Sequence, residues 1–105
     1  MAKDVTAADF DKQVLDDEGV VLVDFWAAWC PPCRILGPII EKVSENTKDI
    51  AKVLKLDVDS NQDIAMRYGI RGIPTVMIFK GGKVVETLVG VRPQEEYERL
   101  LDKHA

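Results

Sequence analysis

The residues from 20 to 26, Val-Val-Leu-Val-Asp-Phe-Trp, form a short apolar run rich in β-branched side chains, which predicts a buried strand. A helical pattern follows soon afterwards, and its apolar residues fall at the spacing of one wide helix face. A buried strand that leads into such a helix favours folds in which strands and helices alternate. The predicted apolar face consists of Ile35, Leu36, Ile39, Ile40 and Val43.

The first helix of the chain is predicted from its capping residues. Thr6 is a helix N-cap, and Asp9 in the third helical position is an acidic relative of the capping box. Val5 and Phe10 lie where a hydrophobic staple would pack across this helix start. We expect the helix to run almost to Gly19, which stops it.

The second half of the chain continues the alternation and closes on two strands joined by a glycine pair. The expected elements are a strand over 52–58, a helix between 60 and 69, strands over 75–79 and 83–89 around Gly81-Gly82, and a helix from Pro93. Strands that alternate with helices and end in a hairpin imply an α/β fold, with a central mixed sheet and helices on both faces.

The length and composition indicate one globular domain over residues 1–105. Hydrophobic residues make up 47% and charged residues 30%, which excludes a disordered chain. The net charge of -4 argues against nucleic acid, which rewards clustered Lys and Arg. No apolar run approaches the roughly 20 residues of a membrane span. The first residues contain no apolar signal core, so we expect a cytoplasmic protein that binds no membrane.

Two cysteines, Cys30 and Cys33, lie at the junction between the strand and the helix that follows it. The helix is expected to begin at Pro32 or Cys33, because Pro32 pushes Pro31 away from the helical conformation. A helix start offers partial positive charge and unpaired amides, which lower the pKa of a thiol there. Cys30 should therefore be an accessible, reactive thiolate, and Cys33, one turn in, its shielded partner in two-step disulfide exchange.

Three other uses of the cysteines compete with this interpretation. A structural zinc site needs four ligands, whereas the chain offers two cysteines and one histidine, His104, next to its last residue. A structural disulfide that closes so short a loop would add little stability. Hydrolysis by a cysteine–histidine pair lacks a suitably placed histidine. Dithiol–disulfide exchange is the chemistry that the pair favours.

Two segments, Trp29-Cys30-Pro31-Pro32-Cys33 and Ile73-Pro74-Thr75, closely resemble those of the thioredoxin family. The resemblance covers essentially the whole chain, and further matches are Asp24-Phe25-Trp26, Pro38, Gly82 and Gly90. It implies a thioredoxin-like three-layer fold and a redox-active Cys30–Cys33 disulfide, with no bound cofactor. The chain departs from the family at Pro31, because most thioredoxins have Gly-Pro between the cysteines. This departure leaves the redox poise and the choice of partners open.

Asp24 is an acid inside a strand that is otherwise apolar. It is either a residue at the wet end of the strand or a buried carboxyl, which is expensive without a partner. The resemblance implies the second role, a carboxyl with a raised pKa that accepts and returns the proton of Cys33. Lys55 would moderate its charge from a neighbouring strand. Cys30 would attack the substrate disulfide, and Cys33 would resolve the mixed disulfide.

The resemblance also implies a docking surface for extended substrate segments. Pro74 is expected to be cis and to face the cysteines, and Ile73 would offer backbone groups to a substrate strand. Trp29 is expected to be partly exposed and to form one wall of this surface. The other residues assigned to substrate binding are Pro31, Pro32, Gly72, Val89, Gly90 and Val91.

The function implied by the resemblance is a general protein-disulfide reductase that acts as a monomer. A separate thioredoxin reductase would restore the dithiol, since the chain has no Gly-rich nucleotide fingerprint. A thiol oxidant or isomerase is a second hypothesis. Such relatives often carry a histidine between the cysteines and an export signal, and we find neither in this sequence. A docking subunit with idle thiols is a third, and it leaves Cys30, Cys33 and Asp24 unexplained.

Overall fold

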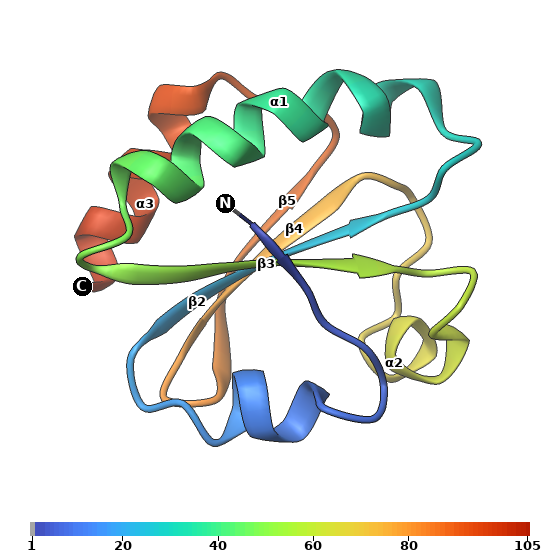
Figure 1. Ribbon diagram of the computed structural model, residues 1–105, viewed down its shortest axis with the longest axis horizontal. Helices are drawn as coiled ribbons and strands as arrows, with labels where there is room; N and C mark the ends of the chain where they lie inside the picture. The colour runs from blue at the N-terminus through green and yellow to red at the C-terminus, as the bar shows by residue number, and fades with distance from the viewer. Residues whose placement is uncertain (1) are drawn as a thin grey trace.

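The computed structural model describes residues 2–105, and Met1 lies outside them. Strands and helices alternate along the chain as expected (Figure 1). The elements are β1 (Lys3–Asp4), η1 (Asp11–Leu15), β2 (Val20–Trp26), α1 (Pro31–Asn46), β3 (Ala51–Asp57), α2 (Gln62–Arg67), β4 (Thr75–Lys80), β5 (Lys83–Val89) and α3 (Gln94–His104). Within residues 2–105, no helix has the length and apolar character needed to cross a membrane.

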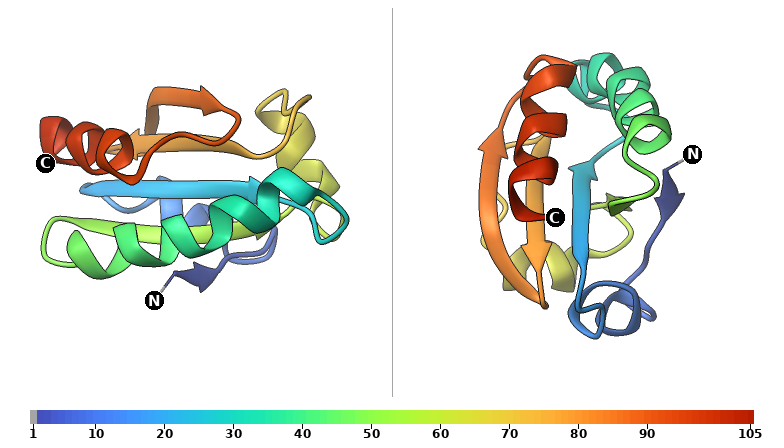
Figure 2. Two further views of the ribbon diagram at one scale, coloured as in Figure 1. Left: turned by 90° about the horizontal axis from the view of Figure 1, so that it is seen from above. Right: turned by 90° about the vertical axis from the view of Figure 1, so that its left-hand side faces the viewer.

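The strands form one mixed sheet in the order β1-β3-β2-β4-β5, and both views of Figure 2 show them side by side, with β5 at one edge and β1 at the other. β1, β3 and β2 are parallel, whereas β4 and β5 run antiparallel to their neighbours. β2 lies at the centre and is paired on both sides, which suits its nearly continuous apolar sequence. The predicted α/β fold with a central mixed sheet is confirmed.

Alternate side chains of β2 enter two separate parts of the core, as expected when successive residues point to opposite faces. Val20 and Leu22 pack with α1 and α3, whereas Val21, Val23 and Phe25 pack with η1 and α2. Figure 1 shows α1 and α3 above the sheet and the other two helical segments below it. This arrangement confirms the predicted three layers and places the end of β2 beside the start of α1.

The first helix is shorter than predicted. Residues 7–9 form turns, and the helical segment η1 ends at Leu15, four residues before Gly19. Half of the expected capping box is present, because the carboxylate of Asp9 accepts the N–H of Thr6 at 2.7 Å. The chain turns early because the β4–β5 hairpin lies against this end of η1. A Cβ on Gly82 would lie only 2.5 Å from the carbonyl oxygen of Leu15.

Two further expectations need correction. Ile35 is 63% exposed, so the buried face of α1 is narrower than predicted and consists mainly of Leu36, Ile40 and Val43. A helix that packs on a sheet from one side buries only one stripe of its surface. The strand β1 was not predicted, because two residues that pair with Leu54 and Lys55 of β3 are too few for a sequence pattern.

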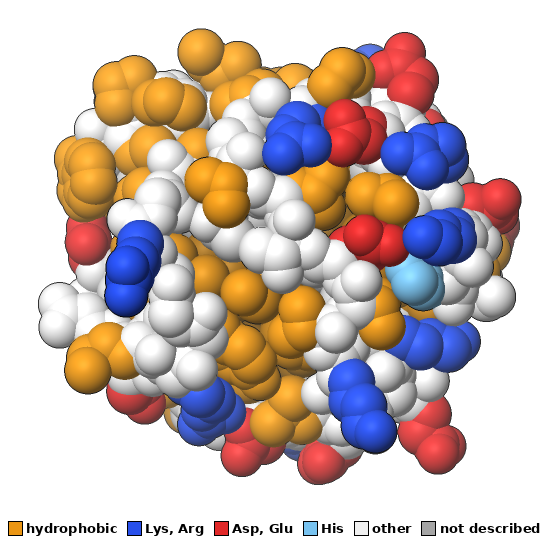
Figure 3. Space-filling model, turned by 180° about the vertical axis from the view of Figure 1, so that it is seen from behind, with side chains coloured by type: hydrophobic (Ala, Val, Ile, Leu, Met, Phe, Trp, Pro, Cys, Tyr) orange, Lys and Arg blue, Asp and Glu red, His pale blue; other side chains and the backbone are white. Residues whose placement is uncertain are grey.

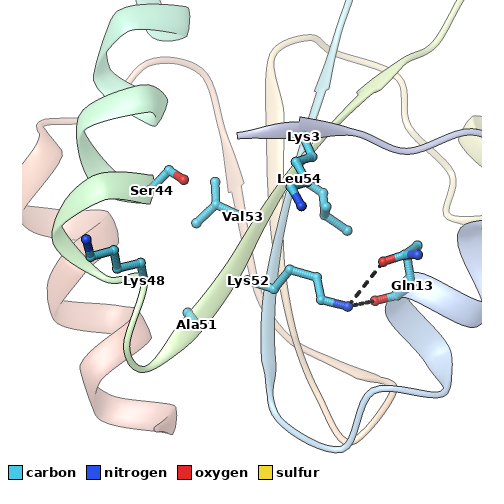
Figure 4. A pocket seen from close by; sticks show the side chains of 8 residues that line it. All are labelled: Lys3, Gln13, Ser44, Lys48, Ala51, Lys52, Val53 and Leu54. Atoms are coloured by element: carbon cyan, nitrogen blue, oxygen red, sulfur yellow. Dashed lines mark hydrogen bonds between the residues drawn. The ribbon is translucent and has the colours of Figure 1, made fainter. Parts of the chain in front are cut away.

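A hollow of about 380 Å³ lies at the end of α1 that is remote from the cysteines (Figure 4). The ammonium of Lys52 donates to the backbone carbonyl oxygen of Gln13 at 2.9 Å and to its side-chain oxygen at 3.3 Å. The same ammonium pairs with the carboxylate of Asp17 at 3.0 Å. Lys52 therefore ties β3 to the segment that begins with η1. The hollow is lined by Lys3, Gln13, Ser44, Lys48, Ala51, Lys52, Val53 and Leu54.

Candidate active site

Cys30 and Cys33 occupy the start of α1. β2 ends at Trp26, a turn follows, and Cys30 is the helix N-cap with an extended backbone. The two cysteines form a disulfide, with their Cα atoms 5.2 Å apart. The N–H of Cys33 donates to the Cys30 sulfur at 3.2 Å, so this sulfur accepts the bond that an N-cap oxygen accepts in most helices. The electropositive helix start therefore acts on Cys30 rather than on its partner.

The helix begins at Pro31, one or two residues earlier than predicted. Pro31 and Pro32 fill the first helical positions, where an amide has no intrahelical partner and its absence costs no hydrogen bond. The fixed φ of a proline suits a helix, and this preference outweighs the restriction that Pro32 places on the residue before it. Cys30 keeps the extended conformation expected of a residue that precedes a proline.

The two cysteines are equally buried in the disulfide form. Cys30 is 3% exposed and Cys33 is 4% exposed, so the expected difference in accessibility is wrong for this redox state. Ala27 shares their apolar cluster, and Ile73 packs against it from a distant part of the chain. The two sulfurs differ instead in hydrogen bonding, since it is the Cys30 sulfur that accepts the helix amide.

The Ile73–Pro74 peptide bond is cis, as the resemblance implies. The carbonyl oxygen of Ile73 lies 3.7 Å from the Cys30 sulfur. On the other side of the proline, the N–H of Gly90 donates to the carbonyl oxygen of Pro74 at 2.9 Å. Direct contacts thus link three segments that are far apart in the sequence, from Cys30 through Ile73 and Pro74 to Gly90.

Trp29 and Ile73 border a hollow of about 340 Å³ beside the cysteines. Trp29 is 65% exposed, and its indole N–H donates to the carboxylate of Asp59 at 2.8 Å. The side chains of Met66 and Arg71 also line this hollow, and Met66 is exposed. The indole is therefore a fixed aromatic wall at the surface rather than a core residue.

Most of the remaining residues of the predicted docking surface lie on the β5 side of Pro74. Val89 and Val91 are exposed, and a Cβ on Gly72 would contact the side chain of Val89 at 3.4 Å. Pro31 and Pro32 are also exposed; Figure 3 shows apolar side chains gathered on the side of the molecule where α1 begins.

Asp24 is 1% exposed, and its Oδ1 atom is buried with no hydrogen-bond partner among residues 2–105. Burial in apolar surroundings raises the pKa of Asp24 from 3.8 to about 7, and the charge of Lys55 opposes this shift only in part. The two residues are direct neighbours on β2 and β3. Asp24 is therefore the buried carboxyl of the two alternatives, not a residue at a wet strand end.

The ammonium of Lys55 lies over the aromatic ring of Trp26. Its distance from the ring centroid is 4.8 Å, within the range of a cation–π contact. The indole N–H of Trp26 is itself buried without a partner in the described chain. Lys55 thus stands near Asp24 without forming an ion pair with it, and it acts on that carboxyl through its electrostatic field.

The comparisons with known proteins agree with this geometry. A family model described as Thioredoxin matches residues 1–103. A thioredoxin of Chlorobaculum thiosulfatiphilum is 46% identical over 101 residues, 96% of this chain and 94% of the relative. One from Listeria monocytogenes is 42% identical over 104 residues, 99% of both chains. One from Bacillus subtilis is 45% identical over 100 residues, 95% and 96% of the two chains. The chain belongs to the thioredoxin family.

As a thioredoxin-family member, the chain is a thiol–disulfide oxidoreductase that reduces disulfide-containing proteins. Its redox group is the Cys30–Cys33 disulfide, so the family's chemistry needs no bound cofactor. No group of three or more His, Cys, Asp or Glu side chains in residues 2–105 is placed to hold a metal ion.

Two residues at the thioredoxin site were missed in the sequence. Asp59 follows the end of a predicted strand, and polar residues after strand ends often reach a site at that edge of a sheet. That signal could have selected Asp59, although its bond to Trp29 joins residues 30 positions apart. Met66 gave no signal, because an exposed methionine on a short helix has no distinctive pattern.

Proposed function

We propose that Cys30 is the nucleophile and Cys33 the resolving thiol in the reduction of protein disulfides. The bond from the Cys33 amide to the Cys30 sulfur supports this assignment, because the same amide stabilises a thiolate at Cys30 in the dithiol form. The Cys30 thiolate attacks one sulfur of the substrate disulfide, and the other substrate sulfur leaves as a thiolate. Cys33 then attacks the Cys30 sulfur and displaces the second substrate thiolate. The protein ends as the Cys30–Cys33 disulfide, having given one electron pair to the substrate.

In this mechanism Asp24 takes the proton of the Cys33 thiol when the mixed disulfide is resolved. Its burial and its unpartnered Oδ1 support the role, as does a pKa of about 7, which allows proton exchange near neutral pH. Lys55 favours the charged carboxylate and so limits how far that pKa rises.

The substrate segment docks across Ile73 and Pro74. The backbone of Ile73 pairs with an extended segment on one side of the target cysteine, while Trp29 forms a wall. Exposed apolar residues beside a buried disulfide support this surface, since a partner can cover them while its sulfur reaches Cys30. The other docking residues are Pro31, Pro32, Gly72, Val89, Gly90 and Val91.

A separate thioredoxin reductase returns the protein to its dithiol form, because each turnover consumes the electron pair of the two thiols. The protein acts as a monomer of one domain, since the cysteines, Asp24 and Pro74 are contributed by one chain. It acts in the cytoplasm, where a reducing environment keeps such a pair ready to donate electrons.

The assignment of the two cysteines is tested by trapping. Cys33→Ser should accumulate mixed disulfides with reducible proteins such as insulin, because Cys30 attacks and nothing resolves the product. Cys30→Ser should trap almost none. Non-reducing gels and intact-mass measurement of the adducts distinguish the two variants, and equal trapping by both would refute the asymmetric mechanism.

A further inference from the structure

Tyr97 on α3 is fully buried, and its hydroxyl makes two bonds to one loop. Its ring belongs to the core between the sheet and the helices α1 and α3. The hydroxyl donates to the carbonyl oxygen of Gly90 at 3.4 Å and accepts the N–H of Arg92 at 3.1 Å. The hydroxyl of Tyr97 therefore bonds to the backbone at both ends of the segment over 90–92 from the side of the core.

The same loop is held from its other side by the cis proline. The N–H of Gly90 donates to the carbonyl oxygen of Pro74 at 2.9 Å, so both polar backbone groups of Gly90 are bonded. Ile73 directly precedes Pro74 in the sequence, and its carbonyl oxygen lies 3.7 Å from the Cys30 sulfur. Direct contacts thus run from Tyr97 through Gly90 and Pro74 to the edge of the disulfide.

We propose that Tyr97 is a positioning residue for protein substrates, and that its hydroxyl fixes the loop over 89–92 against the Ile73–Pro74 segment. This proposal rests on the docking surface of the proposed function. An extended substrate pairs with the backbone beside Pro74 and lies against Val89 and Val91, so the position of this loop determines how well the substrate fits.

A role in positioning the loop over 89–92 explains why this buried side chain carries a hydroxyl, whereas filling the core alone would not require one. Burial raises the pKa of Tyr97, so its hydroxyl keeps its proton and remains a donor to Gly90. Its neighbours on the inner face of α3, Leu100 and Leu101, fill the core without any polar atom. A buried hydroxyl needs hydrogen-bond partners, and here both partners belong to the docking loop.

The test compares Tyr97→Phe with the wild-type protein on two substrates. For a protein disulfide such as insulin, KM should rise about three- to tenfold, the effect of losing one or two ordering hydrogen bonds, while kcat stays within about twofold. For a small disulfide such as hydroxyethyl disulfide, which does not span the loop, both constants should remain unchanged. Hydrogen exchange at the Arg92 amide should become faster.

Thr47→Val is the matched control, because Thr47 is also a buried residue whose hydroxyl donates one bond, to the carbonyl oxygen of Val43 at 2.6 Å. It lies at the far end of α1 and should leave KM for insulin unchanged. Tyr97→Leu also lacks the hydroxyl and should repeat the rise in KM, with a larger loss of stability because it leaves a cavity in the core. KM for each variant is measured at a temperature at which thermal unfolding shows the variant to be fully folded.

An unchanged KM for insulin in both Tyr97 variants, with wild-type protein fully active, would overturn the positioning role alone. Equal losses on insulin and on the small disulfide would also overturn it, because they indicate a general structural effect. Failure of the wild-type protein to reduce insulin would instead refute the proposed function.

Discussion

The amide nitrogen of Cys33 lies 3.2 Å from the sulfur of Cys30, and neither atom belongs to the dipeptide between the cysteines. Pro31 and Pro32 occupy helix positions whose amides have no intrahelical partner. The principal hydrogen bond to the reactive sulfur is therefore independent of the unusual residue at position 31. This residue acts mainly by restricting the backbone.

Replacement of Pro31 by Gly should leave the protein active and change the reduction potential by less than about 30 mV, or roughly 1.4 kcal/mol for two electrons. Stability should fall by up to about 1 kcal/mol, because glycine gives the unfolded chain more freedom. Equilibration with glutathione and urea unfolding of both redox forms measure these effects. A change beyond about 60 mV would show that the dipeptide itself controls the potential.

Asp24 should make the oxidised protein less stable as the pH rises. Its pKa is raised from 3.8 in an ordinary setting to about 7 in the fold, so the folded state holds a proton that the unfolded state releases. The stabilisation is complete below about pH 4 and is lost progressively up to about pH 7, by a few kcal/mol in all. Urea unfolding between pH 4 and pH 8 measures this loss.

The variant Asp24→Asn should flatten this pH profile and be more stable than wild type above pH 7, because the amide avoids a buried charge. It should also slow resolution of the mixed disulfide, which stopped-flow fluorescence can follow. Asp49→Asn removes a charge from an exposed position and should change neither property. Destabilisation of the Asp24 variant with normal exchange kinetics would mark the carboxyl as purely structural.

The bond between Trp29 and Asp59 should matter for substrates rather than for folding. Loss of the carboxylate in Asp59→Ala frees the exposed indole, so KM for insulin should rise by about two- to fivefold, the usual worth of one hydrogen bond. In a Trp29→Phe background, which has no indole donor, the same change should have no further effect. Additive effects in this double-mutant cycle would show that Asp59 acts through another contact.

The two glycines of the β4–β5 turn should respond differently to alanine. Gly81 and Gly82 both have positive φ, but only at Gly82 would a Cβ meet backbone, the Leu15 carbonyl oxygen at 2.5 Å. Gly81→Ala should cost about 1 kcal/mol of stability, the usual penalty for this conformation. Gly82→Ala should cost clearly more, about 3 kcal/mol, because η1 must also move. Thermal unfolding of both variants decides the order.

The central parts of the fold could be predicted because their patterns are local and strong. β2 and the hairpin around Gly81-Gly82 lie where the apolar runs and turn residues place them. The end of the first helix could not be predicted, because it depends on the close approach of Gly82 to Leu15, 67 positions away in the sequence. Long-range contacts of this kind leave no local signal.

In the candidate site, too, local features could be predicted from the sequence, whereas features that depend on long-range contacts could not. The spacing of Cys30 and Cys33 indicates the chemistry, and the resemblance supplies the cis proline. The burial of Cys30 could not be predicted, because Ile73 packs against its cluster from 43 positions away. The fixed orientation of Trp29 likewise depends on a contact between distant segments.

The contact between Ile73 and Cys30 also restricts which molecules can reopen the disulfide. A sulfur that is only 3% exposed cannot be approached from every direction. Because a thiolate attacks a disulfide along the axis of the sulfur–sulfur bond, we expect a thiol on a slender group to reach this sulfur more readily than a thiol on a bulky one. We therefore expect the shape of an electron donor to limit its access to the disulfide, whatever its redox potential.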